Sequence, residues 1–364
     1  MEKKIIMLTT AHRHDDVRIF SKEAQALSKD GWKVEIINRY YCGSWKNKIE
    51  FKKVKIPQGR ISRFLLSRSV MKKELVKSGT DSIIVLHDPE LILMIPFLKK
   101  AGYKTVYDAH EDLLNSISGR RWIAPAFKPA VSRFAGRIIN NYLPQSDAVI
   151  AVTETISKNL ALNATVVRNR VTDEDCKLYD NAINKYPKLE NTVCYAGSIT
   201  EQRGIERMIL CCHNAGAKLL LAGQYESDKL RDKIEKLPQY SCVSYMGVLS
   251  REKIAVIYAK SCAGLLLLDP IKAYMESEPI KLFEYLCAGI PVIASRFEHW
   301  EKLADNNTVL FVDVNCENSI TSAIKKAIES EKLIELAQKR RFKERQKFGF
   351  GEDAVRLTEL FNNL

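Results

Sequence analysis

The sequence has no apolar run long enough to form a membrane-spanning helix. Its apolar runs, such as Ile5–Leu8 and Leu265–Leu268, are far shorter than the roughly 18–20 residues that cross a bilayer. The N-terminus shows no extended apolar core and no small-residue cleavage site. We therefore expect Ile5–Leu8 to form a first strand and not part of a signal peptide.

The sequence also lacks C-x-x-C motifs and the glycine-rich motif of dinucleotide-binding domains. The chain has nine cysteines, an odd number, and no two of them have C-x-x-C spacing. This argues against a zinc site or a disulfide framework, so a reducing compartment is the simpler interpretation and we expect a cytoplasmic protein. No Gly-x-Gly-x-x-Gly follows a predicted strand, which argues against an NAD-dependent dehydrogenase.

Acidic residues are scarce in the first half of the chain. Residues 1–165 hold 28 Lys and Arg against 16 Asp and Glu, whereas residues 166–364 hold 29 against 28. Such a basic surface attracts nucleic acid, anionic lipid or phosphorylated ligands. Because no nucleic-acid motif accompanies it, we expect peripheral contact of the N-terminal domain with an anionic membrane. A solvated basic surface without a partner is the alternative.

Two segments of the first half mix basic and bulky apolar residues, as segments at an anionic interface do. They are Arg63–Lys73 and Gly119–Lys128. An amphipathic core helix would explain the first equally well. In the second, Trp122 and Phe127 flank a predicted loop, which favours the interface.

Short runs rich in β-branched residues alternate with helical stretches along the whole chain. The predicted strands are Ile5–Leu8, Val34–Ile37, Lys52–Ile56, Ile83–His87, Thr105–Tyr107 and Ala148–Val152, then Thr192–Ala196, Lys218–Ala222, Val243–Met246, Gly264–Leu268, Pro291–Ala294 and Val309–Val312. The alternation predicts parallel sheets with right-handed crossovers. We expect an α/β fold with two doubly wound domains that meet near Thr165–Asp175.

Ligands of open α/β sheets bind beyond the carboxyl ends of the strands. With two such sheets we expect the site in the cleft between the domains. One helix is predicted to begin near Pro279, with Ser277 or Glu278 as its cap, and to end at Gly289. Its N-terminus offers free backbone N–H groups and a positive dipole end, which favour a diphosphate.

Charged side chains accompany this helix start. Lys281 adds a mobile cation, and Glu284 can accept two hydrogen bonds from the vicinal diol of a ribose. Glu276, on the preceding loop, is placed to hold sugar hydroxyls. A capped amphipathic helix with solvated acids would show the same spacing, so the spacing alone decides nothing.

The complete string is more specific than its spacing. Glu276 is followed after seven residues by Glu284 and then by Ala-Gly-Ile-Pro-Val-Ile at 288–293. This resembles the family-four glycosyltransferases of the GT-B fold, in a branch common in bacterial surface-polysaccharide synthesis. The resemblance implies two Rossmann-like domains facing each other across a cleft. It also implies that the last helix, about 352–362, crosses back, which gives an N-terminal acceptor-side domain of residues 1–165 plus 350–364 and a donor-binding domain of residues 166–349.

Other strings of the second half support the resemblance. Tyr-Ala-Gly-Ser-Ile-Thr-Glu-Gln-Arg-Gly at 195–204 is similar to the family's strand, loop and helix start. The resemblance implies that Gly197 belongs to the donor site, that Arg203 contacts the donor diphosphate and that Gly247 helps to frame the nucleotide base. Because the family's Gly-Phe-Gly after the first glutamate is absent here, Glu278 could take the role given to Glu276.

Histidines gather at three predicted strand ends of the first half. His12, Asp16 and Arg18 follow the first strand, His87 ends another, and His110 follows a third. A single histidine at a strand end is more often structural, but three strand ends that converge favour a functional site. The resemblance places His110 near the reacting sugar, as a hydrogen-bonding or proton-handling group, and implies that the other four residues serve the acceptor side.

The sequence thus predicts a retaining glycosyltransferase that moves a sugar from a nucleotide-diphosphate sugar to a glycan or a polyprenyl-diphosphate-linked acceptor in cell-surface polysaccharide biosynthesis. Retention is implied by the resemblance, and His110 and Glu276 are the expected catalytic residues. No cofactor or metal is expected, since Asp173-Glu-Asp175 is interpreted as a solvated acidic turn. The alternatives are a nucleotide-sugar epimerase with the same two-domain frame and a degenerate, non-catalytic glycan-binding copy.

Overall fold

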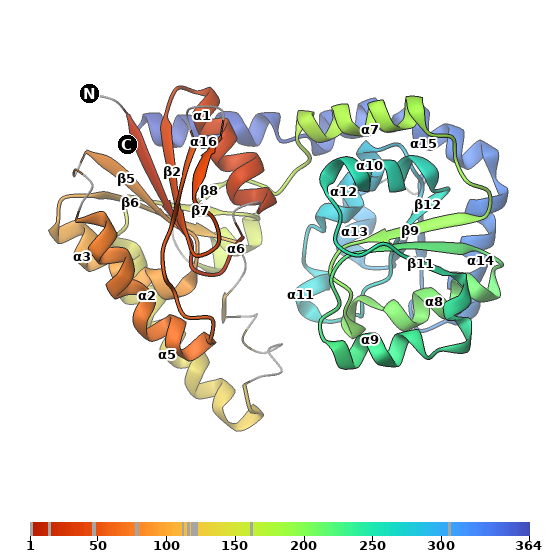
Figure 1. The fold of residues 1–364 in the computed structure, drawn as a ribbon, viewed down its shortest axis with the longest axis horizontal. Helices are drawn as coiled ribbons and strands as arrows, with labels where there is room; N and C mark the ends of the chain where they lie inside the picture. The colour runs from red at the N-terminus through yellow and green to blue at the C-terminus, as the bar shows by residue number, and fades with distance from the viewer. Residues whose placement is uncertain are drawn as a thin grey trace. The chain divides into compact units, whose positions relative to one another are not determined.

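The computed structural model describes residues 3–13, 16–45, 49–76, 79, 81–110, 113–114, 117, 123–160, 163–304 and 307–364. The chain forms two compact units (Figure 1). Unit 1 comprises Met1–Asn169 and Phe350–Leu364, and unit 2 comprises Arg170–Gly349. The predicted domain ranges place the first boundary at residue 165, four residues before the observed division.

Unit 1 is built on one eight-stranded sheet. Its strands are β1 (Lys4–Leu8), β2 (Lys33–Asn38), β3 (Gly43–Trp45), β4 (Ile49–Lys53), β5 (Ser82–Leu86), β6 (Lys104–Ala109), β7 (Ala148–Ala151) and β8 (Thr165–Val166). Their order is β3-β4-β2-β1-β5-β6-β7-β8. The β3–β4 pair is antiparallel, and all the other pairs are parallel. Parallel pairing places the ends of β1, β5 and β6 side by side at one edge.

The two edge strands β3 and β8 are absent from the sequence prediction, which gives six strands for this half. Both are very short, so they contain too few residues to show a period-two pattern. The predicted strand Lys52–Ile56 is also misplaced, because β4 covers Ile49–Lys53. Ile49 and Phe51, which alternate with Glu50, are the residues that β4 buries.

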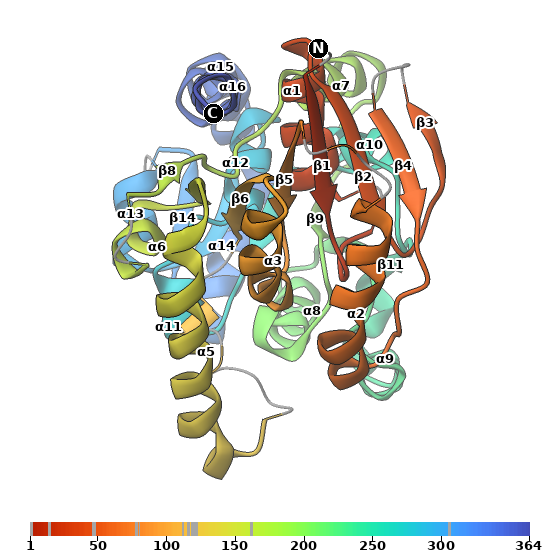
Figure 2. The ribbon, with the colours of Figure 1, turned by 90° about the vertical axis from the view of Figure 1, so that its left-hand side faces the viewer.

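Helices cover the sheet of unit 1 (Figure 2). They are the π-helix η1 (Val17–Ala24), α1 (Gln25–Lys29), α2 (Arg60–Leu75), η2 (Pro89–Met94), α3 (Ile95–Lys100), η3 (Pro125–Phe127), α5 (Lys128–Tyr142), η4 (Leu143–Gln145), α6 (Glu154–Asn159) and α16 (Gly351–Asn362). In η1 the backbone N–H of Ser21 bonds to the carbonyl of Asp16, five residues earlier. The segment after β1 is therefore a π-helix that continues into the short α-helix α1.

The last helix belongs to unit 1 although the chain reaches it from unit 2. Leu357 and Phe361 of α16 are buried, and the Phe361 ring meets the edge of Trp32 at 6.3 Å between centroids. The backbone N–H of Arg168 also donates to Asp353 at 2.8 Å. These contacts confirm that the helix expected near 352–362 returns to the N-terminal unit.

Unit 2 is built on a six-stranded, fully parallel sheet. Its strands are β9 (Thr192–Ala196), β10 (Lys218–Ala222), β11 (Val243–Tyr245), β12 (Ala263–Leu266), β13 (Val292–Ser295) and β14 (Val309–Val312). Their order is β11-β10-β9-β12-β13-β14. The six strands predicted for this half are confirmed, with bounds that agree within two residues. Both faces of this sheet are covered, which makes the strands nearly continuous apolar runs that are easy to recognise.

The helices of unit 2 precede β9, connect successive strands or follow β14. They are α7 (Asp173–Lys185), η5 (Glu201–Arg203), α8 (Ile205–Asn214), α9 (Asp228–Glu235), η6 (Pro238–Cys242), α10 (Arg251–Lys260), α11 (Lys272–Met275), α12 (Ile280–Cys287), α13 (Glu298–Leu303), α14 (Glu317–Glu329) and α15 (Glu331–Phe348). Among the described residues, no helix combines the length and the apolarity that crossing a membrane would take.

The prediction of a solvated turn at 173–175 is wrong. These residues form the first turn of α7, where Thr172 and Asp175 make a reciprocal capping box. Asp175 is buried and forms an ion pair with Arg251. Acidic residues in a first helical turn stabilise the helix through its dipole, which explains this acidic string without a metal.

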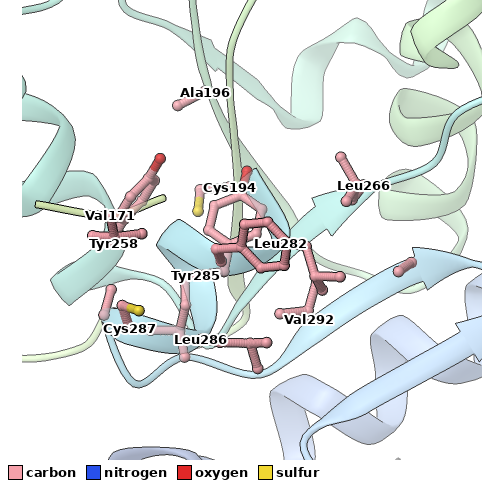
Figure 3. Close-up of a cluster of buried hydrophobic side chains, with 14 of the residues drawn as sticks. Val171, Cys194, Ala196, Tyr258, Leu266, Leu282, Tyr285, Leu286, Cys287 and Val292 are labelled. Atoms are coloured by element: carbon pink, nitrogen blue, oxygen red, sulfur yellow. The ribbon is translucent and has the colours of Figure 1, made fainter. Parts of the chain in front are cut away.

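The core of unit 2 sets the position of α12. Figure 3 shows Tyr258 of α10 together with Leu282 and Tyr285 of α12 inside this apolar cluster, and all three are fully buried. Gly264 of β12 lies directly beneath Tyr285, because a Cβ at this glycine would approach the ring to 2.6 Å. The missing side chain lets α12 pack close to the sheet, which fixes the polar residues of that helix.

Candidate active site

Three histidines lie together at the carboxyl ends of adjacent strands in unit 1. They follow β1, β5 and β6, which are neighbours in the sheet. The rings of His12 and His110 stack with centroids 5.1 Å apart, and His87 meets His110 edge-on at 5.4 Å. The structure thus brings three of the predicted residues into one cluster. The neighbouring residues His14, Glu111 and Asp112 lie outside the described part of the chain.

Asp108, the penultimate residue of β6, is the centre of this histidine cluster. Its carboxylate accepts hydrogen bonds from Arg18, with Nε at 3.1 Å and Nη2 at 2.7 Å. His110 Nε2 lies 2.7 Å and His87 Nδ1 3.2 Å from the same Oδ2. Burial would raise the pKa of Asp108, but the charges of Arg18 and His110 hold it well below its usual value. Asp108 is therefore an ionised, fully buried anchor for two histidines.

A second buried acid, Glu23, completes the charge balance around Arg18. Its Oε1 lies 2.9 Å from Arg18 Nε. Burial, reinforced by the negative charge of Asp108, raises the pKa of Glu23 well above its usual value. Burial thus favours the neutral form of Glu23, and Asp108 is the acid of this cluster whose ionised form the surroundings favour.

His12 and Asp16 form a pair at the partly exposed side of the cluster. His12 Nδ1 lies 3.1 Å from Asp16 Oδ2. Burial lowers the pKa of His12, but the hydrogen bond to Asp16 and the charge of Asp88 outweigh it, so the pKa is raised. His87, which is fully buried, has its pKa lowered by burial. The cluster therefore holds a histidine that favours its charged form next to one that favours its neutral form, as proton exchange with a hydroxyl requires.

The raised pKa of His12 predicts a pH-dependent contribution to stability. A raised folded-state pKa stabilises the protein fully below the unfolded value near 6.5, and this stabilisation is lost as the pH rises through the folded-state pKa. We expect His12→Gln to lower the free energy of unfolding by about 0.2–1 kcal/mol at pH 6 and by less at pH 8.5. Urea unfolding of both proteins at the two pH values measures this. A larger loss at pH 8.5 would contradict it.

Ligand atoms of His87, Asp108 and His110 lie within 4.8 Å of one another, the spacing of a metal-ligand set. Arg18, however, already donates to both oxygens of Asp108. A metal cation bound there would lie next to a fixed guanidinium charge, which disfavours it. The expectation that the protein needs no metal therefore stays a prediction, and this arrangement agrees with it.

In unit 2 the loop after β9 is held close to the loop after β10. The backbone N–H of Gly197 donates to the carbonyl of Ala222 at 2.9 Å. Gly223, at φ +142°, has no room for a side chain, since a Cβ would lie 1.8 Å from the carbonyl oxygen of Gly197. The Gly223 N–H in turn donates to the carbonyl of Gly247 at 2.8 Å. Gly197 and Gly247, two of the predicted donor-binding glycines, thus lie in loops that are both hydrogen-bonded to the loop after β10.

Arg203 ends η5 beside Gly197. Its Nη1 lies 3.5 Å from the hydroxyl of Tyr195, and Tyr274 also bonds to it. Burial lowers the pKa of Arg203, but both tyrosines raise it, and the net shift is upward. Within the described part of the chain, no carboxylate lies within ion-pair distance of Arg203, whereas neighbouring Arg207 pairs with Asp269. Arg203 is thus a half-buried cation, held in place and without an acidic partner, as an anion site requires.

The predicted helix start is confirmed, but its predicted cap is wrong. Helix α12 begins at Ile280, and Pro279 is the N-cap residue, with no side-chain hydrogen bond. Ser277 Oγ donates instead to the carbonyl of Tyr274 at 2.9 Å, and Glu278 pairs with Arg170 at 2.8 Å. With no side chain capping it, the N-terminus of α12 keeps backbone donors available for a ligand.

Lys281 forms an ion pair with the buried Glu284, so Lys281 is not the mobile cation that the sequence suggested. Lys281 Nζ lies 2.5 Å from Glu284 Oε2, which also accepts from the Tyr258 hydroxyl at 2.7 Å. Burial raises the pKa of Glu284, but Lys281 and Arg251 lower it to about 2. Glu284 is therefore an ionised acceptor, and Tyr258 and Arg251 are supporting residues that the sequence prediction missed.

The two candidates for binding the donor sugar have different surroundings. Glu276 is the C-cap of α11, its side chain is 48% exposed, and it lies 3.9 Å from Lys272. Glu278 is held by Arg170, whose guanidinium lies over the ring of Phe283 at 4.4 Å. Glu278 thus has a close and largely buried cationic partner, whereas Glu276 has only a longer contact with the exposed Lys272, and which of the two acids binds the sugar stays a prediction.

Comparison with known proteins shows what the chain resembles as a whole. Its fold is similar to that of a sucrose-phosphate synthase from Thermosynechococcus elongatus, with a TM-score of 0.78 and 16% identity over 99% of this chain and 98% of the other. It is similar to HepE of Anabaena in complex with UDP-glucose, with a TM-score of 0.68 and 14% identity over 99% and 100% of the two chains. WaaG, a glycosyltransferase involved in lipopolysaccharide biosynthesis, gives a TM-score of 0.64 and 16% identity over 98% and 99%.

No curated protein sequence matches the chain. Residues 180–348, which include Gly197, Arg203, Glu276 and Glu284, match the family model described as "Glycosyl transferases group 1". The fold similarities extend over both units at this low identity. The family match covers just under half of the chain and identifies residues 180–348 as a segment of the group 1 glycosyl transferase family; the protein is a glycosyltransferase with the GT-B fold.

Proposed function

We propose that the protein transfers a sugar from a nucleotide-diphosphate sugar to a hydroxyl group of a glycan or lipid-linked acceptor, in cell-surface polysaccharide biosynthesis. The observation that carries the proposal is Arg203, a half-buried cation with no acidic partner among the described residues, beside the glycine loop that follows β9. HepE of Anabaena, which has a similar fold, binds UDP and UDP-glucose. WaaG, also similar in fold, acts in lipopolysaccharide biosynthesis.

In this proposal unit 2 binds the donor. Arg203 and the N-terminal backbone donors of α12 hold the diphosphate and stabilise the leaving nucleotide. Glu284, kept ionised by Lys281 and Arg251, accepts the ribose hydroxyls, and Glu276 accepts hydroxyls of the sugar. Cationic side chains and a helix dipole thus stabilise the negative charge of the diphosphate, which a metal ion stabilises in other enzymes. We propose that no metal or cofactor takes part.

In this proposal the histidine cluster of unit 1 contacts the reacting sugar and the acceptor. His110, oriented by Asp108, forms hydrogen bonds to sugar hydroxyls or takes up a proton. His12, Asp16 and His87 serve the acceptor side, with Arg18 as support. We propose that the anomeric configuration is retained, as the family resemblance of the motifs implies. Cytoplasmic localisation is supported by the cysteines, all of which are unpaired in the structure.

A nucleotide screen tests the proposal. A ligand that binds only the folded protein raises its melting temperature, by an amount equivalent to about 2.7 kcal/mol at a concentration of 100 times Kd. We expect at least one of UDP, GDP and ADP to raise the melting temperature, and CMP, which has one phosphate, to raise it less. If no nucleoside diphosphate binds, in this screen or in calorimetry, the donor assignment is wrong.

Substitution of Glu284 by Gln tests the ribose contact. The amide keeps one acceptor oxygen and loses the charge, so the affinity for a bound nucleoside diphosphate should fall about tenfold, by about 1–1.5 kcal/mol. The affinity for inorganic pyrophosphate, which has no ribose, should change much less. Calorimetry measures both constants. Glu298→Gln is the matched control, because Glu298 also pairs with a lysine on a helix but is 83% exposed. An equal loss for both ligands would contradict the ribose role.

A further inference from the structure

The segment between β12 and α12 has little packing of its own. Its single helical turn, α11, contains no buried residue, and Met275 and Glu276 at its end are exposed. A helix of one turn is not stable by itself in water. The positions of Glu276 and Glu278, the two candidate acids for the donor sugar, therefore depend on contacts that other elements make with this segment.

One such contact comes from Trp300 of α13. Its indole N–H donates to the carbonyl of Ser277, the residue between the two acids, at 2.9 Å. Trp300 is fully buried, and Phe297 meets its ring edge-on at 4.7 Å between centroids. A buried indole has a single polar group, and leaving it unpaired is costly, which favours this hydrogen bond. The segment is thus tied at Ser277 to a side chain of the unit 2 core.

Ser277 carries this restraint toward the diphosphate-binding part of the site. Its backbone N–H and its hydroxyl both donate to the carbonyl of Tyr274, at 3.2 and 2.9 Å. The Tyr274 side chain bonds in turn to Arg203, the cation expected to hold the donor diphosphate. Trp300, Ser277, Tyr274 and Arg203 therefore form one connected series of contacts that begins in the core.

The beginning of the segment is held by the strand that leads to Trp300. Ser295, the last residue of β13, is fully buried, and its hydroxyl donates to the carbonyl of Leu268 at 2.8 Å. The backbone N–H of Asp269 donates to the carbonyl of Gln202 in η5 at 2.9 Å. Polar contacts from β13 and α13 thus fix the segment near both of its ends.

We infer that Trp300 is a positioning residue for the donor sugar. Its indole N–H fixes Ser277 and thereby the positions of Glu276 and Glu278. A sugar is recognised through hydroxyls at fixed spacings, so the segment that carries their acceptors has to be held in place. Packing alone does not account for the contact, because an apolar side chain fills a core without placing an N–H group there.

The inference rests on the proposed function for the presence of a donor sugar, and it concerns unit 2 alone. It is independent of the membrane contact expected for the N-terminal unit; of the basic segment predicted at 119–128, residues 119–122 lie outside the described residues. Ligand titration tests the inference together with the proposed function, whereas hydrogen exchange of the ligand-free protein tests the anchor by itself.

Calorimetric titration of Trp300→Phe with UDP and UDP-glucose, or with GDP and GDP-glucose if the nucleotide screen selects GDP, tests the effect on the sugar. Phe keeps an aromatic ring in the core and removes the N–H. We expect the Kd for the sugar nucleotide to rise about five- to tenfold, as for one lost hydrogen bond, and the Kd for the diphosphate to stay within about twofold. The diphosphate contact is kept because Tyr195 also holds Arg203.

Phe297→Leu is the matched control. It removes aromatic volume next to Trp300 and leaves the indole N–H in place, so it should lower the melting temperature without changing the ratio of the two constants. Ser277→Ala, at a half-buried position, removes the hydroxyl bond to Tyr274. It should weaken sugar-nucleotide binding selectively, by about two- to threefold, even if Trp300→Phe does not fold. An equal loss for both ligands in Trp300→Phe, or the same change of ratio in Phe297→Leu, overturns the inference.

Hydrogen exchange of the ligand-free protein measures the anchor directly. The backbone N–H groups of residues 274–278 should exchange faster in Trp300→Phe than in the parent, and at the parent's rate in Phe297→Leu. Unchanged exchange in Trp300→Phe overturns the inference. If the parent binds no nucleoside diphosphate, the proposed function is wrong, and the exchange rates still decide whether Trp300 fixes the segment.

Discussion

Replacing Asp108 by Ala is expected to lower the free energy of unfolding by about 3–5 kcal/mol, the cost of leaving one partner of a buried ion pair alone. Asp108 is fully buried and accepts two hydrogen bonds from Arg18. Glu23 cannot take over its role cheaply, because burial favours the neutral form of that acid. Urea denaturation of the purified variant measures the loss.

Two further variants separate this pair from a general packing defect. Arg18→Met removes the buried charge that Asp108→Ala leaves unpaired, so the double variant should be destabilised by clearly less than the sum of the two single losses. Glu352→Ala, which breaks an exposed pair with Arg356 on α16, should cost less than about 1 kcal/mol. Strict additivity of the Asp108 and Arg18 losses would refute the buried pair as the cause.

Replacing Arg203 by Ala is expected to weaken the binding of UDP, or of whichever nucleoside diphosphate the screen identifies, by about 10–150-fold. This corresponds to about 1.5–3 kcal/mol for one charge-assisted contact. Stability without ligand should change little, because the described partners of Arg203 are tyrosine hydroxyls and no acid is left unpaired. Isothermal titration calorimetry gives Kd directly.

The controls for Arg203 test charge and geometry separately. Arg203→Lys keeps the charge but loses the planar donor set, so its Kd should lie between those of the parent and the Ala variant. Arg356→Ala removes an exposed arginine from unit 1 and should leave Kd unchanged. If Arg203→Ala binds the nucleotide as tightly as the parent does, the diphosphate is held elsewhere.

The sequence predicted the longer strands of both sheets better than the short strands at the edges of the unit 1 sheet. All six strands of unit 2 were found because each is an apolar run between helical stretches, buried on both faces. The two short edge strands, Gly43–Trp45 and Thr165–Val166, were missed because their local pattern is too brief to separate them from loops. The capping box of α7 could have been recognised, since Thr172 and Asp175 have the required spacing.

For the candidate site, the sequence showed which residue types lie at strand ends. It did not show which residues from other elements they contact in the folded chain. Three histidines were expected to converge, and they lie together. Asp108 was passed over because one acid in a strand pattern says nothing about the arginine that reaches it from another element. Lys281 was expected to be mobile, although its spacing of three residues from Glu284 is one at which opposite charges pair on a helix. The roles of the predicted site residues stay predictions.

The number of residues in η1 (Val17–Ala24) and its π-helical geometry depend on each other. Arg18 and Glu23 are five residues apart, and both are buried on one side of η1. In an α-helix, with about 100° per residue, they would point some 140° apart. Relaxation into an α-helix without a change of length would therefore turn one of the two side chains away from Asp108, whereas deletion of one residue between them would leave them four residues and about 40° apart, on the same face. The segment can thus take up ordinary α-helical geometry and keep both side chains beside Asp108 only if it becomes one residue shorter.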